Sequence, residues 1–138
     1  MEKIYSTAVT ATGGRNGFVK SADNVLDVEV KMPKELGGPA GKFLNPETFF
    51  AAGFAACFDS ALNMIIRTEK IKTGTTSVTA EVDLLKKDDG AFALGVVLAI
   101  SIPDVARALA EELAHKAHQV CPYSNATRGN ITVDLLIK

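Results

Sequence analysis

Apolar and polar positions alternate in several short stretches of the chain. Leu26, Val28 and Val30 alternate with charged residues, a pattern typical of a half-buried strand. Runs rich in β-branched or alternating apolar residues predict further strands at 4–12, 18–21, 77–85, 92–101 and 131–137. Turn residues at 13–17 and 88–90 and a Gly/Pro-rich loop at 33–41 separate these stretches. The chain therefore carries at least six predicted strands.

Two longer segments have the composition of helices. The first begins at Asn45, which can cap a helix, followed by Pro46 and Glu47, which suit its first turn. It is expected to run to about residue 69, and from 49 to 58 it is apolar on every side, so we expect it to be buried all round. The second is predicted from about 103 to 121, because a helix seldom continues through the residue before a proline.

The order of elements is three strands, a helix, two strands, a helix and a strand. This βββ-α-ββ-α-β order predicts an α+β fold with mostly antiparallel pairing around a buried central helix. A chain of 138 residues fits one domain, 1–138. The first helix is hard to cover within so small a domain, so we expect a homodimer whose core includes it.

Composition and charge exclude several classes of partner. The chain is 47% apolar and 22% charged, with a net charge of −1, so neither nucleic acid nor an anionic membrane is an expected partner. The N-terminus has no apolar run of signal-peptide length. The most apolar stretch has ten residues, short of the ~20 that span a bilayer. We expect a cytoplasmic protein.

Two cysteines are the candidate chemistry. In a reducing compartment such a pair is redox-active, metal-binding or simply buried. Cys57 lies about three turns into the first helix, where the helix dipole has faded and burial raises a thiol pKa. A reactive Cys57 therefore needs a cation from elsewhere, and Arg15 in its glycine-flanked turn is the best candidate by type.

Cys121 lies at a carboxyl helix end, where the dipole disfavours a thiolate. Attack by Cys57 and resolution by Cys121 is thus the favoured assignment.

Simpler interpretations exist for each residue alone. A cysteine in an Ala/Phe helix is usually a small buried hydrophobe, and a non-enzymatic, stress-induced ligand-binding dimer would need no more. A metal site is a second rival, because His115, His118 and Cys121 recur every three residues and Cys57 could complete a Cys₂His₂ set. Steps of three drift around a helix, however, and both histidines lie in a charged stretch that we expect to face solvent.

Five segments together carry a resemblance to a known family. They are ATGGRNG at 11–17, PKELGGP at 33–39, NPE at 45–47, FAAGFAACFDSALN at 50–63 and HQVCPYSNATRGNI at 118–131. They span nearly the whole chain, and CFDSAL with VCPYSNATRGN is highly specific. The chain resembles the organic hydroperoxide resistance proteins, within the larger family of osmotically inducible protein C.

The resemblance implies an OsmC-like fold, an intertwined homodimer and two active sites at the subunit interface. It implies Cys57 as the peroxidatic thiol and Cys121 as the resolving thiol, with Arg15 activating the thiolate and Glu47 holding Arg15. It also implies no bound cofactor and a preference for organic hydroperoxides, fatty-acid hydroperoxides included, over hydrogen peroxide. The dithiol co-substrate it implies is a dihydrolipoyl group on lipoylated proteins.

The substrate entrance departs from the family pattern. Phe18 and Phe54 stand where many members have His and Tyr, and the 42–44 segment, Lys-Phe-Leu, is bulkier than expected. An apolar wall that favours a lipid-like substrate is expected from Phe49, Phe50, Phe54 and Phe58, although helical spacing prevents all four from facing one pocket.

The spacing of the candidate residues bears on which subunit supplies them. Glu47 and Cys57 are ten residues apart on one helix, hence ~15 Å along its axis. An arginine side chain is roughly half that long, so the guanidinium of Arg15 does not easily reach both groups of one chain. We therefore expect Arg15 and Glu47 of one subunit to serve Cys57 of the other.

Overall fold

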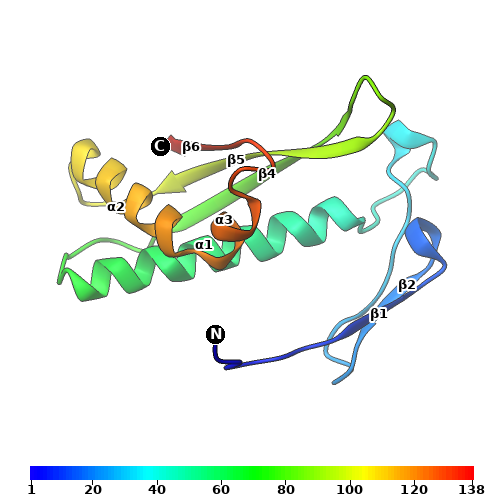
Figure 1. Cartoon of the computed structure of the whole chain (residues 1–138), viewed down its shortest axis with the longest axis horizontal. Coiled ribbons are helices and arrows are strands. Elements are labelled where there is room, and N and C mark those ends of the chain that lie inside the picture. The colour runs from blue at the N-terminus through cyan, green and yellow to red at the C-terminus, as the bar shows by residue number, and fades with distance from the viewer. The chain divides into compact units, whose positions relative to one another are not determined.

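A computed structural model describes residues 1–138 as two compact units, 1–49 and 50–138. The first unit holds three short strands, drawn in blue in Figure 1. They are β1 (Val9–Thr12), β2 (Phe18–Ser21) and β3 (Asp27–Glu29), with single 3₁₀ turns at Gly14–Asn16 and Lys34–Leu36. The strands form an antiparallel sheet in the order β1-β2-β3. Val30 is the one apolar side chain of this unit that is buried, so the unit has almost no core of its own.

The first strand is shorter than its sequence predicts. Residues 4–12 are rich in strand formers, but only Val9–Thr12 is a strand. The physical reason is the length of its neighbour, because β2 has four residues and its last, Ser21, lies opposite Val9. Beyond that point the chain has no strand to pair with.

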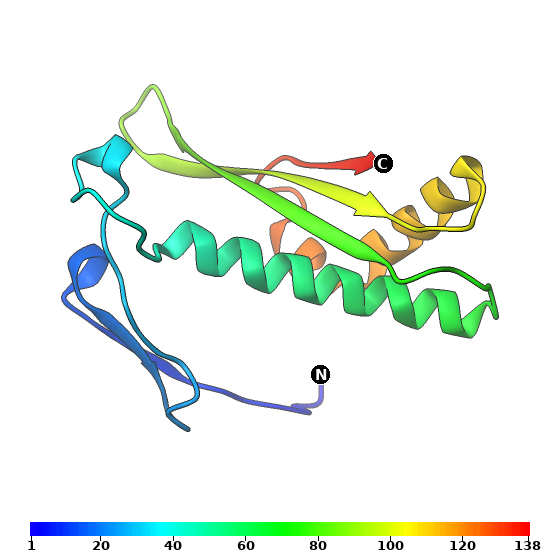
Figure 2. The same ribbon diagram turned by 180° about the vertical axis from the view of Figure 1, so that it is seen from behind.

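The second unit contains most of helix α1 (Pro46–Thr68), which begins in the first unit. After it come β4 (Ser77–Lys86), β5 (Phe92–Ser101), α2 (Arg107–Val120), α3 (Pro122–Thr127) and β6 (Val133–Ile137). The sheet order is β4-β5-β6, with β4 antiparallel and β6 parallel to β5. Figures 1 and 2 show this sheet from its two sides, with α1 and α2 packed against it. The predicted α+β class and element order are confirmed, with α3 added.

One hydrophobic core lies between these helices and the sheet. Its fully buried side chains come from α1, β5 and α2, and the largest are Phe54, Phe58, Leu62, Leu98, Ile100 and Leu113. Strand β5 alternates in burial as its sequence predicts, with Val96, Leu98 and Ile100 inward. Burying one such side chain contributes about 1.5–3 kcal/mol, so this core holds the middle of α1 firmly in place.

Helix α1 is buried on one side only within the chain. Ala52, Ala56, Ser60 and Met64 recur every four residues and are exposed, so they form one stripe along the helix. The expectation of burial on every side is therefore not met within the second unit, because none of its other elements covers this stripe. By length and composition α1 could cross a membrane, contrary to our expectation, but the core helix of a soluble protein passes the same test.

The second helix starts later than predicted and is followed by a helix that the sequence analysis missed. Asp104 has φ 65°, a left-handed conformation that no helix contains, so α2 begins only at Arg107. Pro122 ends α2, as expected, but it also occupies the first position of α3, where a proline is well tolerated. The chain therefore turns a corner at Cys121 between two helices.

Candidate active site

The two thiols lie side by side in the second unit. Cys57 Sγ on α1 is 3.7 Å from Cys121 Sγ, and both cysteines are free. A disulfide bond is about 2.05 Å long, so a small movement of the side chains would join them. Cys57 is half-buried, whereas Cys121 is fully buried. The structure thus brings together two residues that are far apart in the sequence and leaves only Cys57 partly open to solvent.

The position of Cys121 follows from the local backbone. Its N–H still donates to the carbonyl of Ala117, 2.9 Å away, as in a continuing helix. Its ψ of 123° is extended, however, and its own carbonyl accepts the N–H of Asn125 at 3.0 Å in α3. Cys121 therefore ends one helix and begins the next, and the corner directs its sulfur at α1.

The surroundings of Cys57 do not favour its ionised form. Burial raises the pKa of the Cys57 thiol, a hydrogen bond from the backbone N–H of Tyr123 lowers it, and the neighbouring Cys121 thiol raises it again. The overall effect is a pKa above the ordinary cysteine value. The groups of the second unit that surround Cys57 therefore favour the protonated thiol over the thiolate.

Tyr123 is a site residue that the sequence analysis missed. Its ring lies against Phe50 and Phe54, with centroids 6.3 and 5.7 Å apart. It also covers Gly53, where a Cβ would come within 2.8 Å of the tyrosine oxygen, so a side chain there would displace the ring. Pro122 is the sequence signal that could have identified Tyr123. A helix that starts at this proline leaves the N–H groups of its first turn without helical partners, so the N–H of Tyr123 is free to donate to a neighbouring group.

An ion pair forms the charged part of the candidate site, within the first unit. Arg15 Nη1 and Nη2 donate to the two carboxylate oxygens of Glu47 at 2.8 and 2.6 Å, the bidentate geometry of a strong pair. Arg15 follows Gly13 and Gly14, whose φ angles of 80° and 59° suit glycine. Asn45 caps α1 as expected, its side chain accepting the N–H of Thr48 at 2.9 Å.

The electrostatics of this pair are those of a charged carboxylate. The hydrogen bond from Arg15 lowers the pKa of Glu47, and burial opposes this. Glu47 is therefore ionised throughout the physiological range. It fixes the guanidinium through two of the N–H donors, and since a guanidinium carries five, others stay available to a further acceptor.

An apolar pocket of about 520 Å³ lies beside Arg15 in the first unit. It is lined by Val9, Ala11, Gly14, Arg15, Val19, Leu26, Val30, Pro46 and Phe49. Phe18 does not line it, and the 42–44 segment lines a separate pocket of about 540 Å³ in the same unit. An apolar space bordered by one guanidinium suits a ligand with a hydrocarbon part and a polar oxygen.

The four phenylalanines of the expected apolar wall have different surroundings. Phe49 lines the pocket beside Arg15, and Phe50 lines another pocket of about 380 Å³ together with Phe92 of β5. Phe54 and Phe58 are fully buried in the core. The four therefore do not share one pocket, as their helical spacing predicted.

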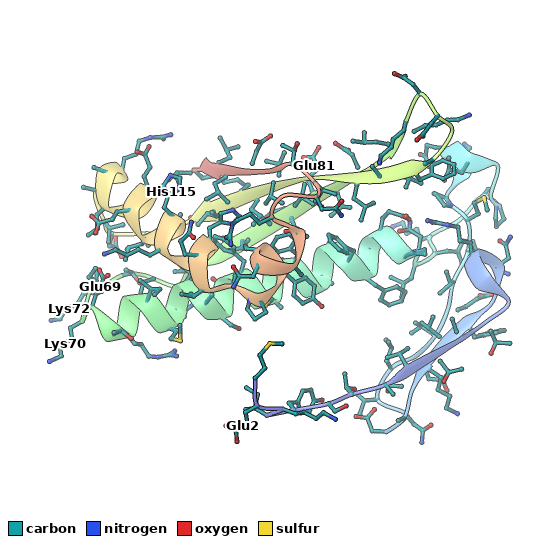
Figure 3. All side chains as sticks on the ribbon, in the orientation of Figure 1. Glu2, Glu69, Lys70, Lys72, Glu81 and His115 are labelled. Atoms are coloured by element: carbon teal, nitrogen blue, oxygen red, sulfur yellow. The ribbon has the colours of Figure 1, made fainter.

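The histidines of the rival metal site do not gather around the thiols. No group of three or more His, Cys, Asp or Glu side chains is placed to hold a metal ion. His115 is exposed on α2, as Figure 3 shows. His118, which we expected to face solvent, is half-buried, because α2 places its ring against Phe58 with centroids 6.4 Å apart.

Comparison with known proteins gives one consistent result. Residues 39–136 match the family model described as OsmC-like protein. The chain is 49% identical over 139 residues to the organic hydroperoxide resistance protein OhrA of Bacillus subtilis, covering 97% of this chain and 96% of the relative. It is 45% identical over 135 residues to the organic hydroperoxide resistance protein of Xanthomonas axonopodis pv. citri, covering 97% and 94%.

A solved structure agrees with these relatives. The crystal structure of an organic hydroperoxide resistance protein from Elizabethkingia anophelis, with crystallant-derived thiocyanate bound, is 55% identical. It superposes with a TM-score of 0.96 and covers 100% of this chain and 99% of that one. The fold and the paired thiols thus define an OsmC-like protein. More narrowly, the chain belongs to the organic hydroperoxide resistance proteins of this family.

Proposed function

We propose that this protein is a thiol peroxidase that reduces organic hydroperoxides to alcohols. Membership of its family implies a role in peroxide detoxification. The observation that carries the finer proposal is the pair of free thiols 3.7 Å apart. One of them, Cys57, is partly open to solvent, while the other, Cys121, is buried behind it. This is the arrangement that an attacking thiol and a resolving thiol need.

The first step oxidises Cys57. Its thiolate attacks the distal oxygen of the hydroperoxide, the O–O bond breaks, and the alkoxide leaves as an alcohol after taking up a proton. Cys57 becomes a sulfenic acid. Resolution follows when the Cys121 thiol attacks the oxidised sulfur, releasing water and forming the Cys57–Cys121 disulfide. An external dithiol then reduces this disulfide by exchange, and we propose dihydrolipoyl groups of lipoylated proteins as that dithiol.

Arg15 is the proposed activator of Cys57. Because burial raises the pKa of Cys57, a cation must stabilise the thiolate and the charge that develops on the departing oxygen. Arg15 is held in a fixed orientation by Glu47 and borders an apolar pocket. A hydrocarbon chain in that pocket would favour organic hydroperoxides over hydrogen peroxide, and fatty-acid hydroperoxides among them.

We also propose a homodimer as the working form. The exposed stripe of α1, Ala52, Ala56, Ser60 and Met64, is made mostly of small residues that allow a second helix to approach closely. In such a dimer, Arg15 and Glu47 of one subunit would serve Cys57 of the other. Sedimentation at micromolar concentration tests the assembly, and a purely monomeric protein would contradict it.

One assay tests the proposed activity. Purified protein is given cumene hydroperoxide or hydrogen peroxide, with dihydrolipoamide as the reductant, and peroxide consumption is followed. We expect much faster consumption of cumene hydroperoxide. No consumption of either peroxide, or equal rates for both, would contradict the proposal.

We also propose a cytoplasmic location, which cell fractionation would test.

Mixed subunits test the sharing of the site. Arg15→Ala and Cys57→Ser chains are each expected to be nearly inactive alone. If the site is shared, heterodimers of the two regain one intact site, and activity returns on mixing and reassembly. If each chain builds its own site, mixing restores nothing.

A further inference from the structure

A side-chain hydrogen bond joins His118 and Ser124, which lie on either side of Cys121 at the corner between α2 and α3. His118 lies three residues before Cys121, and Ser124 lies three residues after it. The Nδ1 atom of His118 is 2.8 Å from the Oγ atom of Ser124. The contact therefore joins the last turn of α2 to α3 across the residue whose sulfur faces Cys57.

The direction of this hydrogen bond follows from the burial of Ser124. Its side chain is 0% exposed, and its hydroxyl makes no hydrogen bond other than that to His118. If Nδ1 carried the proton, the serine hydroxyl hydrogen would be buried without an acceptor, which is unfavourable. The serine must therefore donate, so Nδ1 is the acceptor and the imidazole proton lies on Nε2.

The surroundings keep His118 neutral and able to accept. Burial lowers the pKa of His118, and the charges of Arg128 and His115 lower it further. The α1 side of the ring presents Phe58, the residue next to Cys57. Around neutral pH the imidazole therefore retains a free lone pair for Ser124, whereas the imidazolium would have none.

Other hydrogen bonds hold the corner between α2 and α3 and do not involve the imidazole of His118. Arg128 Nη2 donates to the backbone carbonyl of His118 at 2.6 Å, and its Nη1 donates to the side chain of Asn125 at 2.7 Å. The backbone bond from Asn125 to Cys121 also remains. Loss of the His118–Ser124 bond should therefore loosen the corner rather than unfold it.

We propose that His118 is a positioning residue for disulfide closure, which acts by accepting the hydroxyl hydrogen of Ser124 and so holding Cys121 against Cys57. The inference rests on the redox pair of the proposed function. Closure shortens the 3.7 Å separation of the sulfurs to a bond of about 2.05 Å. A corner held near that geometry raises the effective concentration of one thiol at the other.

The test uses dithiodipyridine, an aromatic disulfide that releases coloured thiopyridone. The Cys57 thiolate attacks it, forms a mixed disulfide and releases the first thiopyridone. Cys121 then attacks the Cys57 sulfur, gives up its proton and releases the second thiopyridone, which leaves the Cys57–Cys121 disulfide. Cys121→Ser, expected to release one equivalent only, identifies the second phase as closure.

Three variants separate positioning from general structure. Ser124→Ala and His118→Leu should slow the second phase by about five- to tenfold, the effect of one lost hydrogen bond, and leave the first phase unchanged. His118→Asn, whose side-chain oxygen can accept at the place of Nδ1, should recover most of the rate. Equal slowing of both phases, an unchanged second phase in Ser124→Ala, or no recovery in His118→Asn would overturn the proposal.

The pH dependence supplies a second readout. The ratio of the closure rates of wild type and Ser124→Ala cancels the ionisation of the thiols themselves. This ratio should fall toward one as the pH drops and His118 becomes protonated, and a constant ratio would contradict the acceptor role. Because no peroxide is used, failure of the peroxidase assay and failure of this test are separate results.

Discussion

The two units of this protein differ in what holds their candidate site residues in place. In the second unit, Cys57 and Cys121 lie against a core of fully buried side chains from two helices and a sheet. In the first, Arg15 and Glu47 are joined by a bidentate ion pair, but Val30 is the only apolar side chain that is buried. The thiols are thus positioned by packing, and the arginine is positioned by charge and by the conformation of a glycine turn.

This difference bears on what each unit can contribute to the chemistry. A packed core fixes the separation of two sulfurs well but raises a thiol pKa, because it removes water from the ionised form. A guanidinium beside an open apolar pocket keeps its charge and can meet a substrate. The proposed reaction needs both properties, so substitutions in the two units should have different effects on rate and on stability.

Substitution of Cys57 should reduce activity most. Cys57→Ser should abolish peroxide turnover, because the attacking sulfur is gone, while circular dichroism and the melting temperature stay close to those of the wild type. Cys121→Ser is the matched control, and it should oxidise once and then stall or over-oxidise. Normal turnover of Cys121→Ser with dithiols would make the second sulfur dispensable.

Substitution of Arg15 should have the second-largest effect on activity. Arg15→Ala should lower the rate of peroxide reduction by about 10²–10³-fold, the usual effect of removing one preorganised charged donor. Arg15→Lys should recover only part of this, because lysine lacks the planar fork that matches Glu47. Measuring the Cys57 pKa by alkylation rates in the same variants is the decisive addition. An unchanged thiol pKa in Arg15→Ala would show that the two units work independently.

Stability should respond very differently in the two units. Leu98→Ala removes a fully buried side chain and should cost about 2–5 kcal/mol in urea unfolding. Leu26→Ala, on the wall of the open pocket, should cost about 0.5 kcal/mol or less. Equal costs would show that the first unit is packed as tightly as the second and would contradict this difference between them.

The ion pair should also make the stability of the protein weakly dependent on pH. Arg15 depresses the pKa of Glu47 in the folded protein, so the contribution of the pair to stability is fully present above the ordinary carboxyl pKa. It is lost as the pH falls through the depressed value. For a partly exposed pair it should amount to about 1 kcal/mol or less. Urea midpoints of the wild type and Glu47→Gln should converge at acidic pH, and parallel curves would contradict the assignment.

Local patterns in the sequence were sufficient for most of the fold. The alternation in β5 and the Asn45-Pro46-Glu47 start of α1 both act through neighbouring residues, and both appear in the structure as predicted. The failures have local causes as well. Because Asp104 has a left-handed backbone conformation, α2 begins later than its sequence predicts. Pro122 is predicted only to end a helix, but in the structure it also begins α3.

Helices, strands, family membership and the residue types available for chemistry could all be predicted from the amino-acid sequence, because they depend on short-range preferences and on characteristic segments. The 3.7 Å separation of the Cys57 and Cys121 sulfurs, by contrast, is a property of the folded chain. So are the contact of His118 with Ser124 and the exposed stripe of α1. These properties depend on how distant segments pack together, and no local pattern encodes the free energy of that packing.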